Sequence, residues 1–333
     1  MKKLIFLILI VVLAAIFYLA RPFPKVEKIS YGATFSQIFS RQLGLDWQKN
    51  YIAVLDDLKV KKLRLMAYWP EIEPEEGKYD FSGLDWQISE AEKRDVEIIL
   101  AIGQKLPRWP ECHIPKWANS ISPDEREQKL LDLIELTIKR YKDKKAVKIW
   151  QVENEPFLSF GECPKLDKNF LDREIALVRK LDSARPVLLT DSGELGLWVP
   201  AAKRGDIFGT TMYFQIYHDL FGQFRWPTFP GFFRMKQRLT DLFVGPKPKI
   251  VIEFQMEPWG EKQLYEMPLE KQLAIFSIGD FDKRIKFVEK TGFSEVYLWG
   301  VEWWYWLKEK ENNPEFWEKA KKLLSNEPKG VKK

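Results

Sequence analysis

Histidine and cysteine are both scarce in this sequence. The 333 residues include two histidines, His113 and His218, and two cysteines, Cys112 and Cys163. The cysteines do not have the paired spacing of a zinc site, and two histidines are too few for a metal cluster. We therefore expect neither a metal nor any other cofactor.

A strong net charge is also missing. The formal charge is +5, and its excess gathers near the end, where residues 307–333 hold eight lysines against five glutamates. No basic helix is interleaved with exposed aromatic rings, so we interpret this segment as solvated and do not expect nucleic acid as a partner. Aromatic residues, by contrast, make up 14% of the chain. Their flat apolar rings suit sugar faces and protein cores alike, so composition alone leaves carbohydrate binding as one option.

Long apolar runs are confined to the N-terminus. Lys2 and Lys3 precede an uncharged run of seventeen residues, Leu4–Ala20, which Arg21 closes. This is roughly the minimum length for a helix that spans a ~30 Å hydrocarbon core. A cleaved signal peptide is the alternative, but Tyr18-Leu19-Ala20 puts a bulky ring where a cleavage site needs a small residue. We favour an uncleaved single-pass anchor in the cell membrane, with the body outside the cytoplasm; secretion after cleavage stays the alternative.

The expected organisation follows from this start. Residues 1–20 would hold the cytoplasmic lysines and the transmembrane anchor, and residues 21–29 a short, proline-stiffened linker. Residues 30–325 would form one domain, because no long linker interrupts them, and residues 326–333 a basic tail. We expect a monomer.

The body alternates apolar runs with amphipathic segments. Expected strands end near Phe35, Ala67, Ile102, Val152, Thr190, Tyr213, Phe254 and Gly300. Expected helices include 46–58, 84–94, 123–141, 170–181 and 268–291. Eight strand–helix units in about 300 residues predict a parallel (β/α)₈ barrel preceded by a transmembrane helix. The weakest part is 219–245, which is rich in Phe, Pro and Gly and shows a clear helical pattern only over 234–243.

Cys112 and Cys163 follow the third and fourth expected strands. Their loops should therefore be neighbours on one face of the barrel. Outside the cytoplasm such a pair can form a disulfide, with Cα atoms within ~7 Å of each other.

Two glutamates end apolar strands, where a charge is costly to bury. Glu155 follows Ile149-Trp150-Gln151-Val152-Glu153-Asn154, and Glu253 follows Lys249-Ile250-Val251-Ile252. The fourth and seventh strands face each other across a barrel, and catalytic groups lie at the C-terminal strand ends. Hydrolysis of a glycosidic bond requires two such carboxyls, one to protonate the leaving oxygen and one to attack the anomeric carbon or support its positive charge.

These elements resemble glycoside hydrolase clan A, the retaining (β/α)₈ enzymes. Besides Asn154-Glu155-Pro156 and the apolar-Glu-Phe context of Glu253, the stretch 69–81, with Glu73-Pro74 and Gly77-Lys78-Tyr79-Asp80-Phe81, is similar to the loop after strand two in several families of the clan. The resemblance covers about residues 31–306. It is cellulase-family-like and shares features with families 5, 39 and 42, so the family stays open.

The resemblance implies a role for each matching residue. Glu155 would be the acid/base and Glu253 the nucleophile, with Asn154 bonding the sugar hydroxyl next to the anomeric carbon. The remaining expected contacts are Arg64, which would hold the nucleophile ionised, Tyr213, whose hydroxyl would point at it, and Trp299, the floor under the cleaved sugar. The sequence departs from the clan at Thr211 and at Gly103-Gln104, where other families place histidines, and these changes bear on sugar specificity.

Several residues have a second interpretation. Glu257, in Met256-Glu257-Pro258-Trp259, competes for the nucleophile role, but its place in a loop favours substrate contact. Trp69 could line the cleft or belong to the core. Arg64 could be a structural ion pair, and Tyr213 and Trp299 could be core residues.

The predicted function is a retaining β-glycoside hydrolase that acts by double displacement on an extracytoplasmic oligo- or polysaccharide. The alternatives are a non-catalytic glycan-binding barrel at the cell surface and an inert envelope protein. The aligned Glu–Glu–Arg–Tyr set favours the enzyme, because neither alternative requires it.

Overall fold

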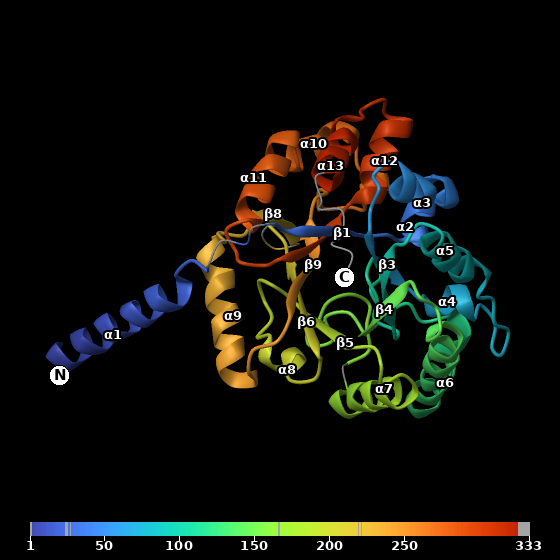
Figure 1. Ribbon diagram of the computed structural model, residues 1–333, viewed down its shortest axis with the longest axis horizontal. Coiled ribbons are helices and arrows are strands. Elements are labelled where there is room, and N and C mark those ends of the chain that lie inside the picture. The colour runs from blue at the N-terminus through green and yellow to red at the C-terminus, as the bar shows by residue number, and fades with distance from the viewer. Residues whose placement is uncertain are drawn as a thin grey trace.

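The computed structural model describes residues 2–23, 26, 28–165, 167–218, 220 and 222–325. Its centre is a closed barrel of parallel strands in the order β1-β10-β9-β6-β5-β4-β3-β2 (Figure 1). The strands are β1 (Ser30–Thr34), β2 (Lys62–Met66), β3 (Glu97–Ile102), β4 (Val147–Val152), β5 (Val187–Asp191), β6 (Ile207–Met212), β9 (Lys249–Gln255) and β10 (Glu295–Trp299). The predicted (β/α)₈ barrel is confirmed, and each strand ends within one residue of the expected position.

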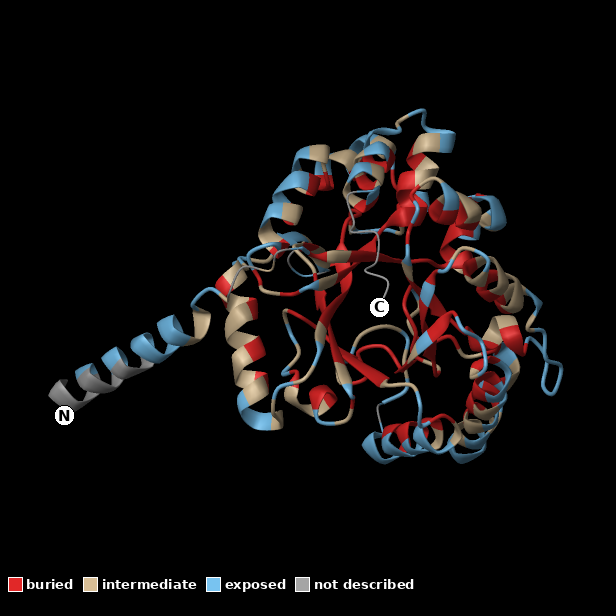
Figure 2. Ribbon diagram, in the orientation of Figure 1, coloured by how far each residue is buried: buried red, intermediate tan, exposed pale blue. Residues whose placement is uncertain are grey.

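The barrel strands are buried along most of their length, and helices cover their outer surface (Figure 2). Parallel strands covered in this way read as continuous apolar runs, which is why the sequence pattern located them. The helices are α2 (Gln37–Gln42), α3 (Trp47–Asp56), α4 (Trp69–Ile72), α5 (Ser82–Glu92), α6 (Pro123–Tyr141), α7 (Lys168–Leu181), α8 (Val199–Ala202), α9 (Pro230–Val244), α10 (Leu269–Ile275), α11 (Ile278–Val288), α12 (Val301–Lys310) and α13 (Glu315–Ser325), with 3₁₀ turns at Lys116–Asn119 and Leu264–Glu266.

The single helix expected over 268–291 is wrong, because two helices occupy this segment. Ser277 and Asp280 form a capping box, in which each side chain accepts a hydrogen bond from the other residue's backbone N–H. Such a pair satisfies the free N–H groups of a helix start, so α11 begins anew after α10 ends.

The segment before β9 contains more structure than its sequence predicted. The hairpin of β7 (Gln215–His218) and β8 (Gly222–Arg225) follows β6, and α9 begins four residues before the expected helix 234–243. A long-range contact secures the hairpin, since the backbone N–H groups of Phe214 and Gln215 both donate to Oε1 of Gln255 on β9. The periodicity of the local sequence cannot predict such a contact.

The N-terminal helix α1 (Lys2–Ala20) projects away from the barrel and meets it at α9 (Figure 1), where Arg234 Nε donates to the carbonyl of Ala20 at 2.8 Å. Within the described part of the chain, no helix is both long and apolar enough to cross a membrane. The structure therefore does not support the transmembrane anchor predicted for residues 4–20. The basic tail predicted for residues 326–333 lies outside the described residues, as do residues 24, 25 and 27 of the linker.

Candidate active site

A cavity of about 710 Å³ opens at the C-terminal ends of the barrel strands. Its lining includes Glu155 and Glu253, which are separated by 98 positions in the sequence. The barrel therefore brings the two predicted catalytic carboxyls into one cleft.

An irregularity in β9 directs Glu253 into the barrel. Val251 and Glu253 pair with the consecutive residues Thr210 and Thr211 of β6, so β9 carries an extra residue, Ile252. Ile252 packs in the apolar barrel interior, and the next side chain, that of Glu253, also reaches inward to Arg64. Bulges of this kind are common beside active sites because they re-aim a side chain.

Two donors hold the carboxylate of Glu253. Arg64 Nη1 lies 2.6 Å from Oε1, and the Tyr213 hydroxyl donates to Oε2 at 2.9 Å. Arg64 is fully buried and also donates from Nε to Gln151 and from Nη2 to Asn154. Hydrogen bonds from a cation to a carboxylate are among the strongest in proteins. The arrangement places Arg64 and Tyr213 where the clan resemblance expects them.

Glu155 has a different environment. Thr211 Oγ1 donates to Oε1 of Glu155 at 3.1 Å. The backbone N–H of Glu155 donates to Thr190 Oγ1, and the backbone carbonyl of Glu155 accepts from Lys105 Nζ. Burial, followed by the charges of Glu253 and Glu111, raises the pKa of Glu155 well above its usual value. A carboxyl with a raised pKa keeps its proton near neutral pH and can act as a general acid.

A strained turn carries Glu155 after β4. Glu153 and Glu155 both have left-handed backbone angles, with φ of 56° and 43°, which non-glycine residues rarely adopt. The carboxylate of Glu153 accepts the backbone N–H groups of Gln104 and Lys105. A Cβ at Gly103 would lie 2.4 Å from Glu153 Oε1, so glycine is required there. The departure from the clan pattern at Gly103-Gln104 thus belongs to the support of the Glu155 turn.

Asn154 reaches the cavity through another residue. It is almost completely buried, and its Oδ1 accepts from Arg64. Its Nδ2 faces the carboxyl of Glu111 at 3.4 Å, and Glu111 lines the cavity. A direct contact between Asn154 and a sugar hydroxyl stays a prediction.

Glu257 and Trp299 meet at a buried arginine that sequence reasoning did not select. Both line the cavity. Arg108 donates to both carboxyl oxygens of Glu257 and, at 2.9 Å, to Glu302, and its guanidinium lies over the rings of Phe39 and Trp299. Burial raises the pKa of Glu257 to about 6, although Arg108 acts in the opposite direction. Arg108 therefore holds the carboxylate of Glu257 at the cavity wall beside Trp299, and its contact with substrate stays a prediction.

Trp69 requires a correction. The sequence suggested that it lines the cleft, but its side chain has no exposed surface. Its indole N–H donates to Glu73, and its ring packs edge-on against Trp117. Trp69 begins the short helix α4 and turns into the core, so it cannot touch a ligand in the cavity.

Other aromatic rings do line the cavity. Successive ring contacts connect Trp109, Phe160, Trp259 and Tyr213, with centroids 5.2 to 6.2 Å apart. These residues belong to loops after four different strands, and such a row offers flat apolar faces to a bound ring. Only the tertiary structure assembles it.

The loop after β3 carries groups that sequence reasoning missed. The disulfide Cys112–Cys163 forms as predicted, with Cα atoms 5.1 Å apart, and ties this loop to the one after β4. Arg108 and Glu111 lie just ahead of Cys112 and line the cavity, as does Glu194 after β5. The one available signal was that charged residues directly precede a cysteine expected at the top of the barrel.

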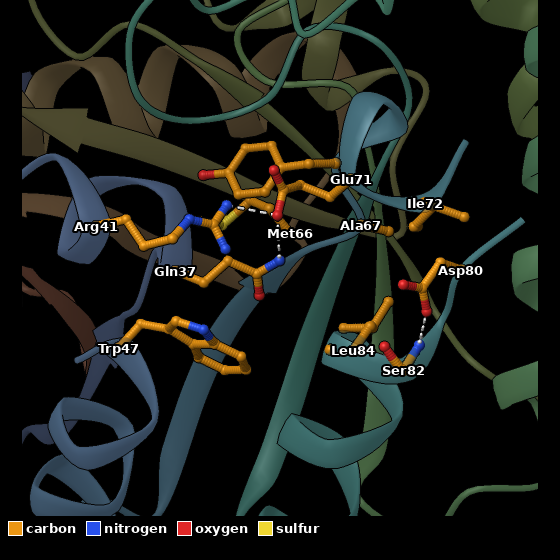
Figure 3. Close-up of a pocket in the computed structure, with 12 residues that line it drawn as sticks. Gln37, Arg41, Trp47, Met66, Ala67, Glu71, Ile72, Asp80, Ser82 and Leu84 are labelled. Carbon is orange, nitrogen blue, oxygen red and sulfur yellow. Dashed lines mark hydrogen bonds and ion pairs between the residues drawn. The ribbon is translucent and has the colours of Figure 1, made fainter. Parts of the chain in front are cut away.

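A second, smaller cavity of about 200 Å³ lies beside α2 and α4 (Figure 3). Two of its charged groups pair with each other, since Arg41 contacts Glu71 at 2.5 Å, and Gln37 contacts the same carboxylate. Neither Glu155 nor Glu253 lines it. We therefore place the candidate active site in the large cavity.

Comparison with known proteins agrees with this geometry. Residues 45–130, about a quarter of the chain, match the model of the glycoside hydrolase 42 family, described as β-galactosidase. The β-galactosidase BgaA of Clostridium cellulovorans is 28% identical over 156 residues, which cover 41% of this chain and 23% of that protein. The chain thus matches only about a quarter of the length of this curated relative.

Solved structures show the same fold at low sequence identity. The cold-adapted β-galactosidase of Rahnella sp. R3 superposes with a TM-score of 0.58 at 12% identity, covering 92% of this chain and 57% of that one. A family 10 endo-β-1,4-xylanase from Gloeophyllum trabeum gives a TM-score of 0.58 at 14% identity, covering 90% and 97%.

The closed barrel and the two carboxyls at its C-terminal face resemble the arrangement in (β/α)₈ glycosidases. The family match and the curated relative agree with this class, and together they support a glycoside hydrolase of clan A.

Proposed function

We propose that the protein is a retaining β-glycosidase in which Glu155 is the acid/base and Glu253 the nucleophile. The observation that carries this proposal is the contrast between the two carboxyls in one cleft. Glu253 is paired with the Arg64 guanidinium, whereas burial, followed by the charge of Glu253, raises the pKa of Glu155. Two carboxyls whose environments differ in this way suit the two roles of double displacement.

In the first step, Glu155 gives its proton to the leaving glycosidic oxygen while Glu253 attacks the anomeric carbon. The bond to the leaving group breaks, and a glycosyl ester of Glu253 forms. In the second step, Glu155, now ionised, takes a proton from water, which attacks the same carbon and releases Glu253. Tyr213 and Arg64 stay on the carboxylate of Glu253 and orient it for attack.

The cleft supports a carbohydrate as the substrate. A cavity of about 710 Å³ with a row of aromatic rings has room for a sugar and groups attached to it, and rings such as Trp259 can stack on sugar faces. An oligo- or polysaccharide is therefore the proposed substrate. The disulfide Cys112–Cys163 supports action outside the cytoplasm, because disulfides persist in oxidising compartments.

Azide rescue tests both roles in one experiment. With a 2,4-dinitrophenyl β-glycoside, Glu155→Ala should form the glycosyl-enzyme and then stall, because no base activates water. Azide, which needs no base, then attacks the intermediate and gives a β-glycosyl azide. Glu253→Ala cannot form the intermediate, so azide attacks the substrate directly and gives the α-azide. Nuclear magnetic resonance of the products distinguishes the anomers.

Glu162→Ala serves as the matched control, since Glu162 is an exposed glutamate in the loop after β4. It should keep wild-type turnover and give no azide product. The same anomer from both active-site variants, or an α-azide from Glu257→Ala, would overturn the assignment of the nucleophile. Binding of oligosaccharide by the wild type without any turnover would favour the glycan-binding barrel instead.

A further inference from the structure

We propose that Glu111 is a specificity-determining residue, which contacts the sugar hydroxyl next to the anomeric carbon while Asn154 holds its carboxyl in place. This inference rests on the proposed glycosidase function. It assigns the direct contact to a carboxyl on the loop after β3 rather than to the asparagine beside the acid/base.

The loop places Glu111 with little freedom. Its carbonyl accepts from the backbone N–H of Leu106 at 2.7 Å, and its own N–H donates to Arg108 at 2.8 Å. The backbone is left-handed, with φ of 71°, and the next residue is the disulfide-bonded Cys112. From the facing loop, Gly161 packs so closely that an added Cβ would lie 2.5 Å from Cβ of Glu111. A side chain held on both sides in this way is pre-organised to contact a ligand.

Hydrogen bonding determines which atom of Asn154 faces Glu111. Asn154 Oδ1 accepts from Arg64 Nη2 at 2.7 Å and from Thr190 Oγ1 at 3.3 Å. The amide nitrogen Nδ2 is therefore the group directed at Glu111, 3.4 Å from its Oε2. Glu111 lines the cavity, whereas Asn154 is 1% exposed and is not part of the lining. Glu111 is thus the member of this pair that a sugar in the cavity meets.

The same contacts locate the hydroxyl group. Arg64 bridges Glu253 and Asn154 with its two terminal nitrogens, and Asn154 contacts Glu111. Two side chains therefore connect Glu111 to the carboxylate that attacks the anomeric carbon, and the charge of that carboxylate also acts on Glu111. The hydroxyl on the neighbouring carbon is the one nearest that point of attack. Hydrogen bonds to this hydroxyl strengthen in the transition state of glycoside hydrolysis.

Burial favours the protonated form of Glu111, which such a contact uses, although Lys105 and Arg64 act in the opposite direction. The ionisable groups that act on it or that it acts on are Glu253, Lys105, Arg64 and Glu155. Burial first, and the Glu253 charge second, raise the pKa of Glu111 to about 8. Near neutral pH the carboxyl accepts from Asn154 on one oxygen and can donate O–H from the other. A neutral carboxyl also adds no repulsion to the charge on Glu253.

The test compares a sugar that has this hydroxyl with one that lacks it. The probes are 4-nitrophenyl β-D-galactopyranoside and its 2-deoxy analogue, or the corresponding glucoside pair if the wild type cleaves glucosides faster. Glu111→Ala should lower kcat/KM about 10- to 100-fold on the hydroxylated sugar and change it less than about 3-fold on the 2-deoxy sugar. Glu111→Gln keeps an N–H donor, so it should retain activity within about 10-fold of wild type on the hydroxylated sugar. Glu162→Ala, in the neighbouring loop, should leave both sugars unaffected.

Equal losses on both sugars would show that Glu111 only supports the loop, and the inference would fall. Unchanged kcat/KM in Glu111→Ala would also overturn it. A wild-type protein that cleaves neither sugar pair nor any other aryl β-glycoside would overturn the proposed function, and this inference with it. Cleavage by the wild type, without a hydroxyl-dependent loss in Glu111→Ala, would overturn the inference alone.

Discussion

Arg64 and Glu253 form an ion pair that is almost completely removed from water. The Nη1···Oε1 distance is 2.6 Å, and the side chains are 0% and 4% exposed. Removing one member of a buried pair leaves the other charge unpaired in a low-dielectric interior. The resulting loss in the free energy of unfolding is far larger than the loss when a surface pair is removed. The pair therefore couples the stability of the barrel to the state of the proposed nucleophile.

Replacing Arg64 with methionine tests this coupling. The Glu253 carboxyl must then either stay buried without a cation or take up a proton, and a protonated carboxyl is a poor nucleophile. We expect kcat to fall by at least about 10²-fold and the free energy of unfolding to fall by about 3–5 kcal/mol. Chemical denaturation and steady-state kinetics measure the two effects.

Arg94→Met is the matched control. Arg94 pairs with Asp56 and Glu90 near the protein surface, where such pairs contribute about 0–1 kcal/mol. It should leave turnover unchanged. Equal effects of the two substitutions would show that Arg64 has no special relation to Glu253.

The pH dependence of turnover should report the proton on Glu155. Because the pKa of this carboxyl is raised, the acid form is present at neutral pH and is lost as the pH rises through that pKa. The wild type should therefore show a basic limb in kcat/KM with 4-nitrophenyl substrates. Glu155→Ala, measured with a dinitrophenyl substrate that needs no protonation, should lack this limb. If Glu155→Ala keeps the basic limb, the titration of another group causes it.

A second buried pair, Glu153 and Glu174, predicts a pH effect on stability. Glu174 lies on α7, and burial, together with the charge of Glu153, raises its pKa well above the usual value; burial also raises the pKa of Glu153. A carboxyl whose pKa is higher in the folded state than in the unfolded state makes its full contribution to stability at pH values below the unfolded-state pKa, which is about 4.3. This contribution is lost as the pH rises towards the folded-state pKa.

Glu174→Gln removes the ionisation and keeps the shape. We expect it to be more stable than wild type at pH 8, by about 1–3 kcal/mol, and close to wild type at pH 4.5. Thermal unfolding at both pH values measures the difference. Glu135→Gln, on the exposed face of α6, should show no such pH-dependent gain. A destabilised Glu174→Gln at pH 8 would mean that the pair is not protonated in the folded state.

Much of the barrel could be predicted because the burial of its strands is visible in the local sequence as apolar runs. Runs such as Glu97–Ile102 and Lys249–Gln255 are apolar because both strand faces are covered. The split between α10 and α11 escaped prediction, although Ser277 and Asp280 carry a local capping signal, because apolar periodicity continues across it. The β7–β8 hairpin escaped for another reason, since its anchor on Gln255 is a contact between distant residues.

The sequence by itself determined which carboxyls end strands, and with them Glu155, Glu253 and the cysteine pair, because strand ends are a local property of an alternating chain. Only the tertiary structure decided what surrounds them. Trp69 turned into the core, Arg108 and Glu111 entered the cleft, and an extra residue in β9 aimed Glu253 at Arg64. These outcomes depend on packing and charge between segments far apart in the chain, and such interactions exist only once the barrel has closed.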